Sequence, residues 1–566
     1  MLESSWTVAL GGLTGTLESI EDVVNGRTHN TIRMGQFEQL EGIDGNGSWQ
    51  RTLGGEVIRL DAPQTIAFAR NQAWVVSRGY LRPGTARYRE LGGREDGGRQ
   101  LRGLEAIPDG GQAMELWFDD ATRLARITQQ LGAIRFVTDF SDWRDVEGLQ
   151  LPFHAVIDRG DPRNLATLTM TSARLGPAVP ESTFAPPVTD ADRLRFAHGK
   201  SSELGFDLIN GQIFVDARVD GQPVRMLLDT GGANLVTRAA AARLGLKVEG
   251  EMAMSGAGDH EVGFGFTHAK TLQVGDATLA NPVLGVAALD GLSASQGEDI
   301  DGLIGYEMFS RVAVRIDYAA CRLTLTAPSA FTPPAGATAV PFEIANHIPV
   351  VRGAIDGIAG RFWIDTGWRS SLTTMAKFTR DRALAARFHA RFETMTGWGV
   401  GGPLRTWPVR IREVTLGSVT VHDVVGGLFT GDKSVLTDPD AAAIIGTGIL
   451  SRFVVTFDYA GRKMYLEPGA AGTRETFDRS GLYLIRAAGG HALRVAAVTA
   501  GGPAERAGVH VDDQITAIDG ASIDTRRLSH WRAQLRDQPP GTRVMLRIDR
   551  AGAARDLALQ LAELVP

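Results

Sequence analysis

The sequence predicts a mainly β, multidomain protein with a duplicated unit at its centre. At 566 residues the chain is too long for one hydrophobic core, and about three to five domains are expected. Short runs rich in Val, Ile, Thr and Phe are broken by Gly, Asn and Asp, which is the pattern of strands joined by turns. An Asp-Thr-Gly motif occurs twice behind an apolar strand, at 229–231 and at 365–367. These observations indicate two similar all-β units.

A second landmark follows each Asp-Thr-Gly motif. The apolar-Gly segments Leu303-Ile304-Gly305 and Ile444-Ile445-Gly446 lie downstream at nearly the same spacing, and each leads to a strand that ends in Asp-Tyr. Landmarks that recur in order at one period indicate a duplicated unit.

Within the two units we expect mostly strands, with brief helices. The expected strands include 212–218, 224–228 and 415–425. The expected helices cover 237–244, which Gly245 ends, and 375–388.

Asp229 and Asp365 are the candidate catalytic residues. If each unit donates one carboxylate to a shared site, the two cannot both ionise comfortably, so one keeps a proton while the other stays charged. Such a pair supplies a general acid and a general base at one place. Gly231 and Gly367 suit a tight turn that needs φ > 0 or a close backbone approach.

Residues 200–470 resemble the aspartic peptidases, specifically the bacterial retropepsin-like group with two lobes in one chain. The resemblance rests on both Asp-Thr-Gly motifs and both apolar-Gly segments. It implies a bilobal aspartic-protease β-barrel fold, with lobe 1 over 200–332 and lobe 2 over 335–470. The implied activity is that of an aspartic endopeptidase, which cleaves a peptide or protein substrate with a water activated between two aspartates.

The resemblance also assigns supporting roles around the two aspartates. The hydroxyls of Thr230 and Thr366 are expected to bond across to the opposite lobe. The apolar-Gly segments are expected to thread beside the aspartate turns and buttress them. The implied active-site support residues are Thr230, Gly231, Thr366, Gly367, Ile304, Gly305, Ile445 and Gly446.

Two glycine-rich segments correspond to the flaps that cover the substrate in this family. They lie at 256–260 and 397–402, and neither contains the flap tyrosine of the pepsin branch. Glycine-rich mobile flaps are usual in the retropepsin-like branch. The flap candidates are Gly256, Gly258, Gly397, Trp398 and Gly399.

Two positions depart from the family pattern. The residue after each motif is usually Ser, Thr or Ala, whereas here it is Gly232 or Trp368, so no hydroxyl is available there for the outer carboxylate oxygen. Ser370 or Ser371 is a candidate substitute in lobe 2, and the bulk of Trp368 raises the alternative of a partly occluded lobe. A catalytically silent scaffold that binds peptides or proteins therefore stands as the alternative function.

Residues 1–190 are expected to form a separate antiparallel β-sheet domain. Strands are expected over 58–60, 114–119, 124–127 and 165–170, with Asp-Gly turns between strands. The segment resembles periplasmic lipoprotein-carrier domains, which are open half-barrels that shelter an apolar ligand. The alternative is a plain β accessory domain that packs on the protease.

Residues 475–562 resemble a PDZ domain of the bacterial protease type. A loop in such domains holds the terminal carboxylate of a peptide by its backbone N–H groups, and a helix over 528–535 is expected to flank the groove. A C-terminal peptide ligand would then join the sheet edge as an added strand. The alternative is a module that docks only internally. The candidate peptide-binding residues are Gly481, Leu482, Tyr483 and Leu484.

Several other functions find no support in the sequence. The net charge is −6 and no basic stripe with aromatics occurs, which disfavours nucleic-acid binding. No apolar run is long enough to span a bilayer. No zinc spacing is present, and the G-x-G-x-x-G match at 397–402 lacks a βαβ context, so neither a metal nor an organic cofactor is implied.

The compartment is inferred only from the resemblance. Residues 1–6 lack the cationic start and apolar core of a signal peptide. The family resemblances nevertheless favour a periplasmic or secreted bacterial protein from which that peptide is absent. Cys321, the one cysteine, rules out a disulfide within the chain and is expected on a strand as a small apolar filler.

Overall fold

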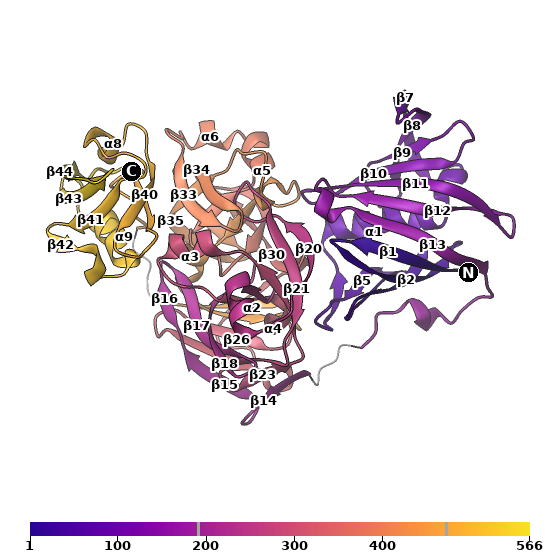
Figure 1. Ribbon diagram of the computed structural model, residues 1–566, viewed down its shortest axis with the longest axis horizontal. Coiled ribbons are helices and arrows are strands. Elements are labelled where there is room, and N and C mark those ends of the chain that lie inside the picture. Colours follow the sequence, from indigo (N-terminus) through magenta and orange to yellow (C-terminus); the bar gives the residue numbers. More distant parts are fainter. Residues whose placement is uncertain (189–192, 470–473) are drawn as a thin grey trace.

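The structure is a computed structural model that describes residues 1–188, 193–469 and 474–566. Three parts follow one another along the long axis: an antiparallel sheet at one end, a two-lobed body in the middle, and a smaller domain at the other end (Figure 1). The fold is mainly β and multidomain, which confirms the predicted fold class.

The N-terminal domain is one antiparallel sheet of 13 strands, in the order β6-β5-β4-β3-β2-β1-β13-β12-β11-β10-β9-β8-β7. One helix packs against this sheet. The sequence did not predict it, because few large apolar residues mark its buried face. The elements are β1 (Leu2–Leu10), β2 (Leu13–Asp22), β3 (Arg27–Met34), β4 (Phe37–Asp44), β5 (Gly47–Arg51), β6 (Val57–Leu60), α1 (Pro63–Val76), β7 (Ala86–Asp96), β8 (Arg99–Pro108), β9 (Met114–Phe118), β10 (Leu124–Leu131), β11 (Ile134–Val146), β12 (Leu149–Asp158) and β13 (Ala166–Leu175).

Lobe 1 is built on the sheet β14-β23-β22-β17-β18-β25-β19-β24-β21-β20, with β16 paired to β17. β14 precedes the expected start of this lobe and pairs with β23. The elements are β14 (Leu194–Phe196), β15 (Ser201–Gly205), β16 (Asp207–Ile209), β17 (Gln212–Val219), β18 (Gln222–Leu228), β19 (Leu235–Thr237), α2 (Arg238–Leu244), β20 (Glu249–Met254), β21 (Val262–His268), β22 (Thr271–Val274), β23 (Ala277–Ala280), β24 (Val283–Ala287), α3 (Asp290–Gln296), β25 (Gly302–Ile304), α4 (Tyr306–Phe309), β26 (Ala313–Asp317) and β27 (Arg322–Thr326).

Lobe 2 repeats the same plan in the sheet β29-β30-β31-β36-β32-β35-β34-β33. The elements are β28 (Thr338–Pro341), β29 (Glu343–Ala345), β30 (Ile348–Ile355), β31 (Ile358–Ile364), β32 (Leu372–Thr374), α5 (Ala376–Asp381), α6 (Leu384–Arg387), β33 (Thr394–Gly399), β34 (Gly402–Leu416), β35 (Val419–Leu428), β36 (Ala443–Ile445), α7 (Thr447–Leu450), β37 (Phe453–Asp458) and β38 (Lys463–Pro468).

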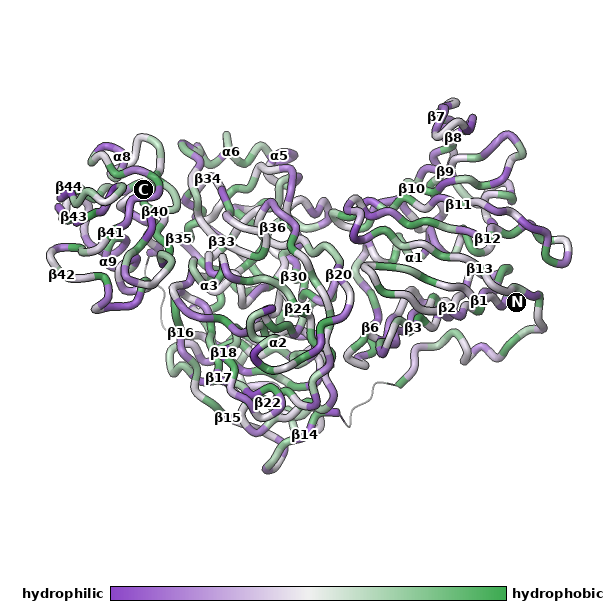
Figure 2. Tube along the Cα trace, viewed as in Figure 1, coloured by the Kyte–Doolittle hydropathy of each residue, from purple (hydrophilic) through white to green (hydrophobic). Residues whose placement is uncertain are grey.

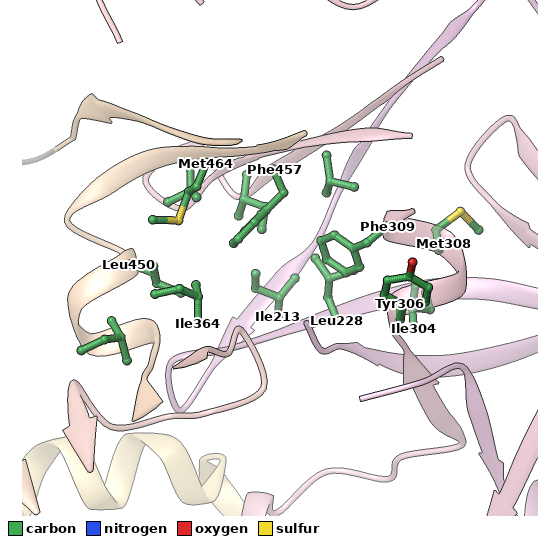
Figure 3. Packing of buried hydrophobic residues seen from close by; sticks show 14 of the residues in the cluster. Ile213, Leu228, Ile304, Tyr306, Met308, Phe309, Ile364, Leu450, Phe457 and Met464 are labelled. Atoms are coloured by element: carbon green, nitrogen blue, oxygen red, sulfur yellow. The ribbon is translucent and has the colours of Figure 1, made fainter. Parts of the chain in front are cut away.

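The two lobes are joined by a shared six-stranded sheet, β15-β27-β26-β37-β38-β28. The Asp-Tyr strands of the two repeats, β26 and β37, pair antiparallel at its centre. Side chains of both lobes fill one core, in which Leu228 and Phe309 of lobe 1 lie near Ile364 and Phe457 of lobe 2 (Figure 3). Hydrophobic segments gather inside this body, whereas the β7–β8 hairpin of the N-terminal sheet is hydrophilic (Figure 2). The shared core fixes the two lobes relative to each other.

The C-terminal domain is a small sheet, β39-β40-β41-β43-β44 with β42 paired to β41. Its amphipathic helix α9 buries Leu528, Trp531 and Leu535 against this sheet. The elements are β39 (Leu482–Arg486), β40 (Leu493–Val498), α8 (Pro503–Arg506), β41 (Gln514–Ile518), β42 (Ala521–Ser522), α9 (Leu528–Asp537), β43 (Arg543–Arg550) and β44 (Ala553–Gln560).

Three local predictions are wrong. The helix expected over 375–388 is two short helices, α5 and α6, because Ala383 adopts a left-handed φ of 48° between them. The strand expected over 415–425 is the end of β34 and the start of β35, which a turn at Gly417 joins. Cys321 lies in the turn between β26 and β27, with a φ of 50°, and not on a strand.

Candidate active site

Each candidate catalytic aspartate follows a buried strand that a neighbouring strand supports. Asp229 follows β18, and Asp365 follows the equivalent strand β31. β25 runs parallel to β18, and β36 runs parallel to β31. The backbone N–H of Asp229 donates to the Ile304 carbonyl at 2.8 Å, and that of Asp365 donates to the Ile445 carbonyl at 3.0 Å. The apolar-Gly segments therefore lie beside the aspartate turns in both lobes.

Two buried threonines connect the turns across the lobe interface. The Thr230 hydroxyl donates to the Ile364 carbonyl at 2.8 Å and accepts from the Thr366 N–H at 3.0 Å. The Thr366 hydroxyl donates to the Leu228 carbonyl at 2.9 Å and accepts from the Thr230 N–H at 3.0 Å. Both threonines are fully buried. This reciprocal pair fixes the position of one aspartate turn relative to the other.

The two carboxyl groups meet at this interface. They hydrogen-bond to each other, and each also accepts a hydrogen bond from its own turn. The Gly231 N–H donates to Asp229 Oδ1 at 2.8 Å, and the Gly367 N–H donates to Asp365 Oδ1 at 2.7 Å. The structure thus brings together the two aspartates that the repeat singled out.

The motif glycines are required by close approach and not by a positive φ. A Cβ on Gly231 would lie 2.5 Å from Oδ2 of Asp365, and a Cβ on Gly367 would lie 2.6 Å from Cγ of Asp229. The glycines of the supporting segments are equally confined, because a Cβ on Gly305 or Gly446 would lie 2.2 Å from a backbone carbonyl oxygen of the turn. A side chain at these positions would force the two turns apart.

Burial controls the protonation of the pair. Loss of water raises the pKa of both carboxyls, and the rise is larger for Asp365 because the charge of Asp229 adds to it. The backbone N–H groups of the turns act in the opposite direction by stabilising the charged form. The two groups titrate as a unit, which holds a proton to a higher pH than an exposed aspartate does.

Backbone N–H groups bond to the aspartates at the two positions that depart from the family pattern, and that of Trp368 shares Asp365 Oδ1 with the Gly367 N–H. The Trp368 N–H donates to Asp365 Oδ1 at 3.1 Å, and the Gly232 N–H lowers the pKa of Asp229 by a hydrogen bond. The Trp368 indole packs on the lobe 2 core and donates to Thr373 Oγ1 at 3.1 Å. The indole is therefore held on its own lobe.

The serine proposed to replace the missing hydroxyl does not do so. The Ser371 hydroxyl donates to Glu475 Oε2 at 2.6 Å, and its side chain is fully buried. Glu475 also accepts from the Val425 N–H at 3.0 Å and lies 3.6 Å from Arg452. Ser370 instead lines a cavity against the C-terminal domain. Ser371 thus anchors the segment that leads to this domain.

The two predicted flaps are hairpins whose tips meet. The β20–β21 hairpin carries Gly256 and Gly258, and the β33–β34 hairpin carries the glycine-rich segment of lobe 2. The Gly258 N–H donates to the Val400 carbonyl at 2.9 Å, and the His260 N–H donates to the Gly401 carbonyl at 3.1 Å. Val400 packs on an apolar cluster of lobe 1. The second flap therefore reaches across from its own lobe.

The remaining flap candidates lie on β33. Gly397 and Gly399 pair with β34, and Trp398 packs near α3 and against Tyr483 and Ile485 of the C-terminal domain. The base of the second flap is therefore in contact with this domain.

The predicted carboxylate-binding loop of the C-terminal domain is already bonded within the chain. The Gly481 N–H donates to Asp478 Oδ2 at 2.6 Å, and the Leu482 N–H donates to Ser480 Oγ at 3.1 Å. Leu482, Tyr483 and Leu484 are buried, and the Leu484 carbonyl accepts a hydrogen bond from Arg532 of α9. The sequence could not indicate Asp478 or Arg532, because neither belongs to a motif.

The sequence indicates no functional role for two buried tyrosines near the dyad. Tyr318 and Tyr459 end the Asp-Tyr strands of the two repeats. Burial raises the pKa of each, and the charge of Asp365 raises both further. Neither hydroxyl has a hydrogen-bond partner among the described residues. Both tyrosines therefore stay neutral beside the pair.

The fold and the site define a class. Two repeated all-β lobes, each with an Asp-Thr-Gly turn and an apolar-Gly segment, form an aspartic-protease fold with one carboxyl from each lobe at the interface.

Comparison with known protein families supports this class. Residues 215–308 match the profile of a family described as aspartyl protease, and residues 494–550 match that of a PDZ domain. The chain thus carries an aspartyl protease domain and a C-terminal PDZ domain, which confirms the predicted resemblance.

Comparisons with solved structures and with curated proteins do not extend this assignment. A putative outer membrane lipoprotein-sorting protein domain from Vibrio parahaemolyticus is 14% identical, with a TM-score of 0.25; the match covers 32% of this chain and 88% of that chain. A LolA superfamily protein from Nitrosomonas europaea is 13% identical over the same shares, with a TM-score of 0.24. Structural similarity this low does not support the lipoprotein-carrier resemblance, which therefore stays a prediction. No curated protein matches the chain.

Two further properties concern only the residues that the structure describes. Among them, no group of three or more His, Cys, Asp or Glu side chains is arranged to hold a metal ion. Within the same ranges, no helix has the length and apolar character needed to cross a membrane.

Proposed function

We propose that the protein is an aspartic endopeptidase whose catalytic residues are Asp229 and Asp365. One observation carries the proposal: two buried carboxyls, supplied by equivalent turns of a duplicated unit, hydrogen-bond to each other across the lobe interface. Buried carboxyl pairs of this kind are found where a protein needs an acid and a base together.

The chemistry follows from the shared proton. A water held between the carboxyls loses a proton to the ionised member and attacks the scissile carbonyl, which the protonated member polarises. The resulting tetrahedral intermediate collapses when the leaving amine is protonated by the pair. Activity requires one proton on the pair. Because burial raises both pKa values, the proton is retained above the range of exposed aspartates, and the optimum is acidic to near neutral.

The flaps and the PDZ domain are assigned supporting roles in this proposal. The flap tips part to admit a peptide and meet again over it, which excludes water during the reaction. The PDZ domain contributes to recognition of the peptide. Location in the periplasm or outside the cell stays a prediction from the sequence.

Cleavage of an undirected peptide library tests the proposed activity. The full chain is incubated with the library between pH 3 and pH 8, and new termini are identified by mass spectrometry. We expect internal cleavage with an acidic to near-neutral optimum that a statine-containing peptide suppresses, since its hydroxyl takes the place of the attacking water. A folded protein that cleaves nothing across this range would favour the alternative, a silent scaffold.

A further inference from the structure

A cavity of about 500 Å³ lies between lobe 2 and the PDZ domain. This volume is within the range of ligand sites, which is roughly 300–1,000 Å³. One wall is the α9 face formed by Ser529, Arg532, Ala533 and Arg536, and another includes Arg369, the fourth residue after Asp365. Figure 1 shows the PDZ domain beside β33, β34 and β35 of lobe 2. The cavity therefore lies between the segment that follows the Asp365 turn and the α9 face of the PDZ domain.

The PDZ loop is not the anion-binding element of this cavity. The Asp478 carboxylate accepts from the Gly481 N–H at 2.6 Å and from the Ser480 hydroxyl at 2.7 Å, so an internal acid occupies the loop. The guanidinium of Arg532 bonds to the Leu484 carbonyl, which is an acceptor on the strand next to the groove. A ligand in this cavity must be recognised by other groups.

Most charged groups that line the cavity are already paired. Glu475 interacts with Ser371, Val425 and Arg452, and Asp478 is held by the PDZ loop. Arg536 forms two hydrogen bonds with Asp537, at 2.7 and 2.8 Å. Two other charged side chains line the cavity, and both are positive.

Arg369 and Arg532 have no carboxylate partner among the described residues. Each bonds to a carbonyl, Arg369 to that of Thr396 at 2.8 Å and Arg532 to that of Leu484. Both contact the ring of Tyr483, with Cζ 5.6 Å and 5.0 Å from its centroid. Nη1 of Arg532 and the Tyr483 hydroxyl are both buried and lie near each other, without a well-formed hydrogen bond to any described residue. Two like charges and two incompletely bonded polar atoms therefore lie together at this cavity.

Such an arrangement is unfavourable unless an anion completes it. An unmet buried donor loses its hydrogen bonds to water, and two neighbouring guanidiniums repel each other. Burial lowers the pKa of Arg532 to about 10; the charge of Arg369 adds to this lowering, whereas Tyr483 and the charge of Asp478 oppose it. A carboxylate would accept from both guanidiniums in charge-assisted hydrogen bonds.

We propose that this cavity binds a carboxylate of a peptide substrate, held by Arg369 and Arg532 beside Tyr483. This inference rests on the proposed function and extends it, because it names the part of the substrate that the enzyme recognises. Arg369 is the fourth residue after Asp365, so the anchored group is held by the segment that follows the Asp365 turn. The carboxylate is either the C-terminus of the peptide or an acidic side chain.

Peptide binding to an inactive protein tests the site separately from catalysis. The probes are three fluorescently labelled alanine–leucine hexapeptides: one with a free C-terminal carboxylate, one amidated, and one amidated with a final glutamate. Fluorescence polarisation measures their binding to full-length Asp365→Asn protein. The same measurement is made after adding Arg369→Met, Arg532→Met or Arg532→Lys. Arg536→Met is the matched control, because Arg536 lines the cavity but is paired.

We expect the free acid to bind at least about tenfold more tightly than the plain amide. Arg369→Met and Arg532→Met should each remove this preference, whereas Arg536→Met and Arg532→Lys should keep most of it. Tight binding of the glutamate-ended amide would assign the site to acidic side chains, and weak binding would assign it to the C-terminus. Equal binding of acid and amide, no binding of any probe, or a preference that survives Arg369→Met would overturn the proposal.

Discussion

Glu307 lies outside the dyad, and the fold shifts its pKa close to neutral. It lies in the first turn of α4, two residues after Gly305, and accepts from the Asn234 N–H at 2.6 Å. Asn234 in turn accepts from the Gly305 N–H at 2.7 Å. Burial raises the pKa of Glu307 to about 7. The support of one aspartate turn is thus linked to a carboxyl that titrates near neutrality.

The pKa of Glu307 predicts a loss of stability as the pH rises. Between pH 4.5 and pH 7 the unfolded state has released this proton while the folded state keeps it, so the free energy of unfolding falls by about 3 kcal/mol. Glu307→Gln should remove this component, and its stability relative to the parent should rise across the window. Urea unfolding at pH 4.5 and pH 7.5 measures the difference, with exposed Glu90→Gln as the control. Parallel pH dependence of parent and Glu307→Gln would contradict the assignment.

At this scale the sequence indicated the residues that belong to a repeated motif. Asp229, Asp365 and their threonines stand in identical positions of two units, so their meeting could be inferred from the duplication. Glu307 and Arg369 carry no such signal. Their importance depends on burial and on partners far along the chain, which a single sequence does not specify.

In the predicted flap hairpins, the space around each glycine limits which side chain fits there. Gly258 of the first flap lies against the second, where a Cβ would be 2.2 Å from the Gly401 carbonyl carbon. Gly397, on β33, has more room, with its nearest neighbour a Leu404 side-chain atom 3.4 Å away. The two glycines differ in what a methyl group would meet.

Gly258→Ala should prevent the tips from meeting. The Gly258–Val400 hydrogen bond would be lost and the reaction would be exposed to water, so kcat/KM should fall by about 100-fold. Gly397→Ala, the matched control, should stay within about threefold of the parent, because its new methyl makes only ordinary contacts. Steady-state kinetics on a peptide cleaved by the parent, with hydrogen exchange of the flap amides, decides between these outcomes. Equal rates and equal protection in both variants would show that the tips need not meet.

Strands and hairpins were largely predictable, whereas their exact limits were not. Glycine-rich segments between alternating strands marked both hairpins, and the capping Thr237 and terminal Gly245 marked α2. The errors fell where a single residue adopts a left-handed conformation, as Ala383 does between α5 and α6. Composition does not reveal such a residue when it is not glycine.

The flanking domains each hold one flap. Asn164 of the N-terminal domain forms two hydrogen bonds with the backbone of Ala253 on β20, at 2.9 and 3.0 Å. The PDZ domain packs Tyr483 and Ile485 against Met395 on β33. The two predicted flap hairpins are therefore connected, toward opposite ends of the molecule, to domains outside the two lobes.

The N-terminal domain is also anchored to lobe 1 by a buried ion pair. Glu56 contacts Arg311, and both side chains are almost fully buried. The Arg311 guanidinium also donates to the Gly54 carbonyl at 3.0 Å. The sequence predicted the class of fold and the PDZ domain, but not this docking, because such pairs join residues that no local pattern relates.

A double-mutant cycle tests whether the carboxyls from the two lobes act as one catalytic unit. The kcat/KM of the parent is compared with that of Asp229→Asn, Asp365→Asn and the double variant, with exposed Asp109→Asn as the control and thermal unfolding as the check on folding. Groups that act as a unit are not additive, so each single change should lower kcat/KM at least about 1,000-fold and the double change should lower it no further. A single variant that cleaves at the parental rate, or losses that multiply in the double variant, would show that the two carboxyls do not act as one unit.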